Sequence, residues 1–279
     1  MGNDAAPLAA AMADRLAATL RELGQATVAV SGGVDSMTLA SFAHRTLGRD
    51  AVRMVHAVSP AVPRAATERV KARGAEEDWR LELADAGEFN DERYRANPVN
   101  RCYFCKSNLY GLLSAMPGDK VLSGANRDDL GDYRPGLRAA AENNVRHPYV
   151  EAGFTKSDVR ALARTLGLPE LAALPSSPCL SSRIETGLRI EPAALVMIDE
   201  IEEWLKQTLA PKTVRCRLRR QGIVIELDEE TIARLTPDLK AALITELNMQ
   251  RPDLDGGKTE IITYRRGSAF VGNKDQTPQ

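Results

Sequence analysis

The chain has 279 residues, of which 43% are hydrophobic and 27% charged, and its formal net charge is −1. This length and composition fit a globular protein of one large domain or two modest ones. A balanced charge provides no overall basic field, so nucleic acid is not an expected partner. We expect a cytoplasmic protein without a membrane partner, because no apolar run is long enough to span a bilayer and the start of the chain lacks a signal-peptide pattern.

The first predicted elements lead to a short turn around which the rest of the chain is organised. Apolar residues at helical spacing predict a helix over 8–23, and the β-branched run 26–30 predicts a buried parallel strand. Helical apolar spacing resumes over 37–43. The turn between this strand and helix, residues 31–36, therefore lies at the carboxyl edge, where open α/β sheets bind ligands.

This turn has the composition of a phosphate cradle. Gly32 and Gly33 let backbone N–H groups approach a ligand without a Cβ in the way, and the helix start adds free N–H donors. Ser31 and Ser36 supply hydroxyls, and Asp35 can hold a Mg²⁺ ion. No Gly-Lys-Ser/Thr follows, which excludes the P-loop pattern and suits a leaving pyrophosphate. The alternative is a Gly-Gly turn that only begins a helix.

The next elements predict a parallel sheet. A strand over 51–59, a helix over 64–77 and a strand over 79–83 continue a βαβαβ alternation. In a doubly wound sheet the end of the second strand lies beside the first loop, so His56 can contact the nucleotide base. A histidine of the core or strand end is the alternative, and it is preferred over a catalytic role.

The segment before the next predicted helix carries Cys102 and Cys105. Their C-x₂-C spacing lets two thiolates reach one metal or cluster, or form a redox disulfide. Two ligands do not complete a structural zinc site, and the chain has no second C-x₂-C. In a reducing compartment the four cysteines are expected to be thiols or metal ligands rather than structural disulfides.

A fourth buried strand, 120–125, leads into a polar loop at the same carboxyl edge. Gly124 and Asp128 are predicted to belong to the ATP site, where Asp128 or Asp129 can support Mg²⁺ or the adenosine. Solvated loop carboxylates are the alternative. Arg134, at the mouth of the following helix, is placed for a phosphate or a carboxylate.

A loop rich in proline and serine, 174–183, carries Cys179 and Arg183. This loop has no core to fill, so Cys179 is not readily explained by packing. Arg183 can lower the pKa of that thiol or bind a phosphate. The domain boundary is predicted just after the loop, which gives a first domain over 1–187, a smaller α+β domain over 188–270 and a polar tail over 271–279.

The smaller domain is expected to run helix, strand, strand, helix, helix, strand. In its first strand Arg215, Arg217 and Arg219 share one face, while Cys216 faces the apolar side and is expected to be buried. Such a row of arginines indicates either a solvated sheet surface or a polyanion site. The site is favoured, because Arg220 adds charge and little acid lies nearby in the sequence.

Several segments together resemble one known family. The turn 31–36 resembles the SGGxDS signature of the PP-loop ATP pyrophosphatases. Four further segments, 101–106, 132–136, 154–160 and 179–183, resemble the LarE family of ATP-dependent sulfur transferases, which help to build the nickel-pincer nucleotide of lactate racemase. Each segment alone is weak evidence for this family, whereas the order and spacing of all the segments together are specific for it.

The resemblance implies a doubly wound α/β fold of the PP-loop, adenine nucleotide alpha hydrolase-like type with a second, smaller α+β domain. It also implies a two-step reaction that uses ATP and Mg²⁺. ATP adenylates a carboxylate of a pyridinium dicarboxylate mononucleotide and releases pyrophosphate. Sulfur then attacks the acyl-adenylate, giving a thiocarboxylate and AMP. Relatives form ring-like oligomers, which implies a homo-oligomer.

The family has two sources of sulfur, and the cysteines of this chain match one of them. In one branch a single loop cysteine, matching Cys179, gives up its own sulfur. In the other, three cysteines hold a [4Fe-4S] cluster whose open iron carries sulfide. Cys102, Cys105 and Cys179 match the three-cysteine branch, so sulfide or another sulfur donor is an expected partner.

The resemblance also assigns roles to residues of the substrate pocket. Glu202, Arg215 and Arg217 match family positions that line the pocket for the substrate phosphate and carboxylate. With Arg134 and Arg183, the two arginines are expected to bind substrate. Cys179, Asp35 and Glu202 are the expected catalytic residues.

Other functions remain open at this point. A tRNA-thiolating PP-loop enzyme would need a basic RNA surface, which the net charge of −1 disfavours. A nucleotide sensor would bind ATP without turnover. An amide-forming ligase of the NAD synthetase kind would need none of the cysteines.

Overall fold

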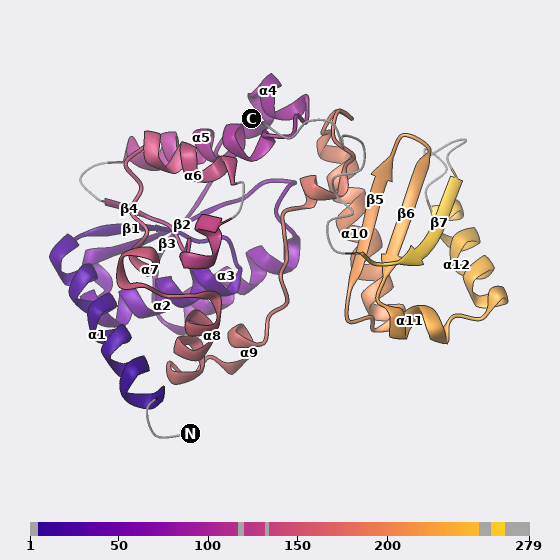
Figure 1. Ribbon diagram of the computed structural model, residues 1–279. Helices are drawn as coiled ribbons and strands as arrows, with labels where there is room; N and C mark the ends of the chain where they lie inside the picture. The colour runs from indigo at the N-terminus through magenta and orange to yellow at the C-terminus, as the bar shows by residue number, and fades with distance from the viewer. Residues whose placement is uncertain (1–4, 117–119, 132–133, 251–257, 266–279) are drawn as a thin grey trace. The chain divides into compact units, whose positions relative to one another are not determined.

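The computed structural model describes residues 5–116, 120–131, 134–250 and 258–265 (Figure 1). The chain divides into two compact units, Met1–Asp91 with Asn100–Ser177, and Glu92–Val99 with Pro178–Gln279. The predicted tail over 271–279, and residues 132–133 of one family-like segment, lie outside the described residues. None of the described helices combines the length and apolar composition that a bilayer crossing requires.

The first unit is built on a four-stranded parallel sheet with the strand order β3-β2-β1-β4. The strands are β1 (Ala26–Ala29), β2 (Val52–Ala57), β3 (Arg80–Ala84) and β4 (Lys120–Leu122). The strand order reverses direction between β1 and β4, so the crevice outside their carboxyl ends is where such a sheet accepts a ligand. The predicted α/β fold with a parallel sheet is confirmed.

Helices cover both faces of this sheet, which makes the unit doubly wound (Figure 1). Leu16 and Leu20 of α1 and Met37 of α2 belong to one apolar cluster, and Leu113 of α5 and Ala139 of α6 belong to another. Burial on both sides explains why the central strand β1 reads as a continuous apolar run, whereas the edge strand β3 is mostly exposed. The helices of this unit are α1 (Ala5–Leu23), α2 (Val34–Leu47), α3 (Arg64–Glu76), α5 (Arg101–Ser114), α6 (Pro135–Glu142), α7 (Pro148–Ala152), α8 (Lys156–Thr165) and α9 (Pro169–Ala172).

The second unit contains a three-stranded mixed sheet. Strand β5 pairs antiparallel with β6, which pairs parallel with β7. Cys216 is fully buried in β5, as the alternation predicted. The expected order of helix, strand, strand, helix, helix, strand is confirmed. Its elements are α4 (Glu92–Arg95), α10 (Pro192–Leu209), β5 (Val214–Arg219), β6 (Gly222–Leu227), α11 (Glu229–Arg234), α12 (Pro237–Gln250) and β7 (Lys258–Thr263).

Residues 92–99 leave the first unit and pack with the start of the second. The Asn97 side chain donates hydrogen bonds to the backbone oxygens of Glu185 and Leu188, both at 2.9 Å. Tyr94 and Ser181 hydroxyls lie 2.6 Å apart. Residues 178–187, which the sequence analysis grouped with the first domain, are therefore hydrogen-bonded within the second unit.

Candidate functional site

The turn at 31–36 connects the end of β1 to the start of α2 and is closed by its own two serines. The backbone N–H of Ser31 donates to Ser36 Oγ at 3.0 Å, and the two hydroxyl oxygens are 3.0 Å apart. Ser36 Oγ in turn donates to the Gly33 oxygen at 3.2 Å. Gly33 is the N-cap of α2 and no side chain caps that helix. The first N–H groups of α2 are therefore left without a side-chain acceptor, as suits an anion site.

Two glycines let neighbouring backbone approach this turn. Gly32 has φ +79°, and a Cβ there would lie 2.7 Å from the backbone oxygen of Ala66 in α3. Gly124, just beyond β4, would place a Cβ only 2.8 Å from the Ser36 backbone nitrogen. Real Cβ atoms do not come this close, so Gly124 lets the ends of β4 and β1 meet.

This approach brings a polar cluster to Asp35. Asn126, in the loop after β4, donates to one carboxylate oxygen of Asp35 at 3.3 Å. Lys156, the first residue of α8, forms an ion pair with the other oxygen. The Lys156 backbone N–H donates to Asp128 at 3.0 Å, which ties the predicted Asp128 into the same cluster. Each carboxylate oxygen has a second lone pair, so the arrangement also fits Mg²⁺ at Asp35.

Lys156 is a site residue that the sequence analysis missed. It lies in the family-like segment 154–160, but nothing local distinguishes it from a solvated lysine. Thr155 and Asp158 form a capping box that fixes this start of α8. Lys156 thus places a positive charge beside a cradle that lacks the P-loop lysine.

Tyr149 contacts the backbone of Asp35 in this cluster. Its hydroxyl donates to the Asp35 backbone oxygen at 3.3 Å. Burial, with the Asp35 charge, raises the pKa of Tyr149 well above its ordinary value. The hydroxyl therefore stays protonated and remains a donor.

His56 is fully buried, and both of its ring nitrogens are engaged within the protein. Nδ1 lies 2.8 Å from the Val30 oxygen, and Nε2 lies 2.9 Å from the Thr67 hydroxyl. A carbonyl only accepts, so Nδ1 carries the proton and Nε2 accepts from Thr67. Burial lowers the pKa of His56, which keeps the ring neutral. His56 therefore lies in the core, as the alternative to a functional role expected. Its contact with a nucleotide base stays a prediction.

Arg134 lies at the same carboxyl edge as the loop after β4. Its guanidinium forms a 2.8 Å ion pair with Asp129, and its side chain is about half exposed. Asp129 also accepts from the Asn126 backbone at 3.0 Å. The structure therefore links Arg134 to the loop that contacts Asp35.

The predicted cluster ligands are divided between the two units. Cys102 and Cys105 lie three residues apart in the first turns of α5, on one side of the helix, and they are exposed and half-buried, respectively. Cys179 is exposed in the second unit, at the head of the 3₁₀ turn Leu180–Arg183. Accessible thiols one helical turn apart suit soft metal ligation. Among the described residues no group of three or more His, Cys, Asp or Glu side chains is arranged to hold a metal ion, so the three-cysteine cluster stays a prediction.

Behind Cys179, Arg183 and Glu202 form a buried, two-pronged ion pair. Arg183 Nε and Nη2 donate to the two Glu202 oxygens at 2.8 and 3.0 Å, and the Cys216 N–H donates to one of them at 2.9 Å. Burial is the largest single influence and acts to lower the pKa of Arg183, but the hydrogen bonds and charge of Glu202, together with Cys179 and Cys216, outweigh it and raise that pKa. Both predicted site residues therefore already have partners within the second unit.

The arginine face of β5 is partly neutralised by an acid on the next strand. Arg217 forms a buried 2.8 Å ion pair with Glu226 of β6, and Arg219 lies 3.7 Å from the same side chain. The expectation that little acid opposes these arginines was wrong, because the pairing of β5 with the next strand brings Glu226 beside Arg217. Burial and the neighbouring charge of Arg183 lower the pKa of Arg215, whose guanidinium lies over the Tyr264 ring.

Known proteins of three organisms are similar in sequence to this chain. An uncharacterized protein of Synechocystis is 39% identical over 225 residues, which are 78% of this chain and 82% of the relative. The pyridinium-3,5-bisthiocarboxylic acid mononucleotide synthase of Lactiplantibacillus plantarum is 32% identical over 221 residues, 78% of this chain and 79% of that protein. An uncharacterized protein of Methanocaldococcus jannaschii is 32% identical over 138 residues. No protein-family model matches the chain.

Breaking the buried pair behind Cys179 is expected to be costly. Glu202→Gln leaves the Arg183 charge buried without its counter-charge, so the free energy of unfolding should fall by about 3 kcal/mol in a urea titration. Glu203→Gln, on the exposed side of the same helix, is the matched control and should change it by less than about 0.5 kcal/mol. Equal losses in the two variants would contradict the assigned role of the pair.

The buried His56 and the half-buried His147 should make the free energy of unfolding depend on pH. Burial lowers the folded-state pKa of His56 and of His147, so the unfolded chain binds more protons just below pH 6.5. Stability is then complete above that pH and falls as the pH decreases, by at most about 1.4 kcal/mol per pH unit for each histidine. His56→Asn should flatten the dependence measured by urea unfolding between pH 7.5 and 5.5. An unchanged slope would contradict a neutral, buried His56.

Proposed function

Because this chain belongs to the LarE family, that of the Lactiplantibacillus plantarum synthase, we propose that it is an ATP-dependent sulfur transferase acting on a pyridinium dicarboxylate mononucleotide. The product would be the thiocarboxylate, a step in nickel-pincer cofactor biosynthesis. The name of this relative describes a pyridinium bisthiocarboxylic acid mononucleotide. The observation that carries the ATP chemistry is the Asp35–Lys156 pair beside the double-glycine turn.

In the first proposed step, a substrate carboxylate oxygen attacks the α-phosphorus of ATP and pyrophosphate leaves. The N–H groups at the start of α2 would bind the phosphates, and the Lys156 ammonium would offset the charge that develops on pyrophosphate. Asp35 would hold Mg²⁺ and orient Lys156. This division of roles follows from the contacts of Asp35 with both Lys156 and Asn126.

In the second proposed step, a sulfur nucleophile attacks the acyl carbon of the adenylate and AMP leaves with the bonding electrons. We propose that Cys102, Cys105 and Cys179 hold a [4Fe-4S] cluster, which when bound would supply the sulfide. The accessibility of these thiols supports this assignment. The alternative is that Cys179 itself donates its sulfur, and assembly as a homo-oligomer stays a prediction.

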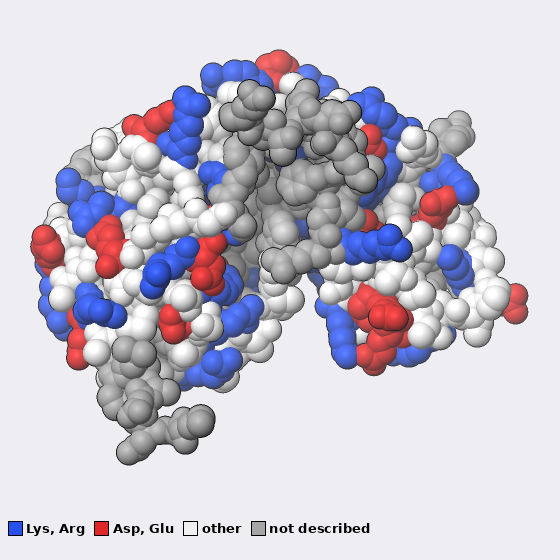
Figure 2. Space-filling model, viewed as in Figure 1, with Lys and Arg blue, Asp and Glu red and all other residues white. Residues whose placement is uncertain are grey.

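The charge distribution supports a small nucleotide over tRNA as the acceptor. Basic and acidic side chains are interspersed on the face of the first unit seen in Figure 2, and the net charge is −1. A tRNA acceptor would favour a continuous basic surface. Salt-sensitive binding of tRNA would favour the alternative of a tRNA-thiolating enzyme instead.

Replacing the site lysine should stop adenylation without unfolding the protein. We expect Lys156→Met to lower pyrophosphate release from ATP and pyridinium-3,5-dicarboxylate mononucleotide by about 100-fold or more, because a positioned charge on the leaving group is lost. Lys120→Met, at the opposite end of β4, is the matched control and should retain wild-type release. Retention of most of the activity by Lys156→Met, with an unchanged thermal midpoint, would contradict the proposed role.

The sulfur source can be tested by metal analysis under anaerobic conditions. Reconstituted protein should hold about four iron and four sulfide per chain, and Cys102→Ser should lose them. Cys216→Ala alters a cysteine buried in β5 and should leave the iron content unchanged. If the wild-type protein holds no iron, and Cys179 gives its sulfur to the product and loses the mass of H₂S in one turnover, the sacrificial mechanism would be established instead.

A further inference from the structure

Helix α3 contacts residues 31–36 through two of its own residues, Ala66 and Arg69, which are three positions apart. The backbone oxygen of Ala66 lies so close to Gly32 that a Cβ at that position would be 2.7 Å from it. Arg69 Nη1 donates a 2.7 Å hydrogen bond to the Gly32 backbone oxygen. Gly32, which has a left-handed backbone, thus has Ala66 packed against its Cα and Arg69 hydrogen-bonded to its carbonyl.

Holding this carbonyl determines where the next N–H points. A trans peptide unit is planar, and its C=O and N–H bonds point in opposite directions. The Gly32 oxygen points towards Arg69, so the Gly33 N–H points away from α3. Its nearest acceptor is the exposed Ser31 hydroxyl at 3.5 Å, which is too long for a strong hydrogen bond. This N–H is therefore available to a stronger acceptor such as a phosphate oxygen.

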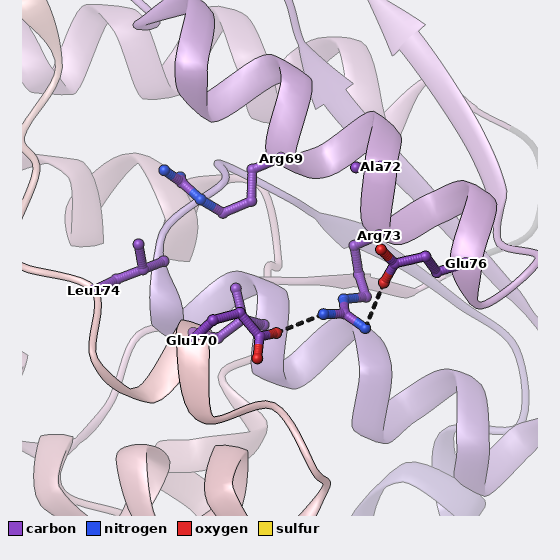
Figure 3. Close-up of a pocket in the computed structure, with 7 residues that line it drawn as sticks. Arg69, Ala72, Arg73, Glu76, Glu170 and Leu174 are labelled. Carbon is purple, nitrogen blue, oxygen red and sulfur yellow. Dashed lines mark hydrogen bonds and ion pairs between the residues drawn. The ribbon is translucent and has the colours of Figure 1, made fainter. Parts of the chain in front are cut away.

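The surroundings of Arg69 distinguish it from its neighbour on the same helix. Both arginines line a cavity of about 210 Å³ between α3 and α9. Arg73 forms ion pairs with Glu76 at 2.8 Å and with Glu170 at 2.5 Å, whereas the Arg69 guanidinium points away from these carboxylates (Figure 3). Within the described residues Arg69 forms no ion pair, and burial lowers its pKa. Its charge is thus only partly solvated and is not neutralised by an acid.

We propose that Arg69 is a positioning residue of the phosphate site: by holding the Gly32 carbonyl, it keeps the Gly33 N–H directed at the phosphates of bound ATP. Arg69 acts through the backbone and does not touch the nucleotide. The inference rests on the proposed function only in that the turn binds ATP. It assigns to α3 a role that no motif in that helix predicts.

The test compares two arginines on one helix. Arg69→Met should raise the dissociation constant for ATP·Mg by about 10-fold to 100-fold, as for loss of a charged hydrogen bond. Arg69→Lys keeps one donor and should recover part of the affinity. Arg73→Met loses packing in the same cavity and the ion pairs with Glu76, Glu77 and Glu170, so it should lower the thermal midpoint at least as much as Arg69→Met while binding ATP like the wild type.

A second readout separates positioning from stability. In ¹⁵N–¹H spectra, ATP should shift the Gly33 amide strongly in the wild type and in Arg73→Met, and weakly in Arg69→Met. An ATP affinity of Arg69→Met within twofold of the wild type, or equal losses in Arg69→Met and Arg73→Met, would overturn the inference. If the wild type binds ATP yet releases no pyrophosphate with the pyridinium substrate, the proposed reaction fails, and the ratio of ATP affinities still decides the role of Arg69.

Discussion

The candidate site depends on how closely two strand ends approach each other. Gly124 beyond β4 lies against the backbone of Asp35 and Ser36, where any side chain would collide with the turn. This contact brings the loop after β4 within reach of Asp35 and lets Asn126 hydrogen-bond to its carboxylate. Ligand binding is expected at this edge, where strand order reverses, and polar side chains from three separate segments, Asp35, Asn126 and Lys156, meet there.

The turn itself is contacted by three helices. Lys156 of α8 pairs with Asp35, and Tyr149 of α7 hydrogen-bonds to the Asp35 backbone. Helix α3 contacts Gly32 through Ala66 and Arg69. A phosphate site needs N–H groups that are already oriented, because reorienting them during the reaction would reduce the electrostatic stabilisation they supply. The contacts around the turn are of the kind that meets this requirement.

In the second unit a buried ionic network supports the segment that carries Cys179. Arg183 lies four residues after this cysteine and is anchored to Glu202 of α10, which also accepts from β5. Removing two charges from water is unfavourable unless their geometry and remaining hydrogen bonds are nearly complete, as they are here. The network therefore restrains one end of the loop while leaving the thiol exposed.

Local patterns were sufficient to predict the strand–turn–helix at 31–36, the parallel sheet, and the order of elements in the second unit. Each depends on residues adjacent in sequence, whose spacing determines which side chains can be buried together. The same reasoning predicted that Cys216 would be buried, because alternation in a strand assigns each residue to a face.

The partners of these residues were decided only by tertiary structure. Lys156 pairs with Asp35, which is 121 positions away in the sequence. Glu226 forms an ion pair with Arg217 of the neighbouring strand. The Asn97 side chain hydrogen-bonds to the Glu185 backbone of the second unit, although no local pattern separates residues 92–99 from the first unit. The physical reason is that an ion pair or buried hydrogen bond depends on distance in space, whereas a sequence specifies only distance along the chain. Composition and periodicity therefore determined which elements form and which face of each is buried, and the packing of those elements decided which charges meet.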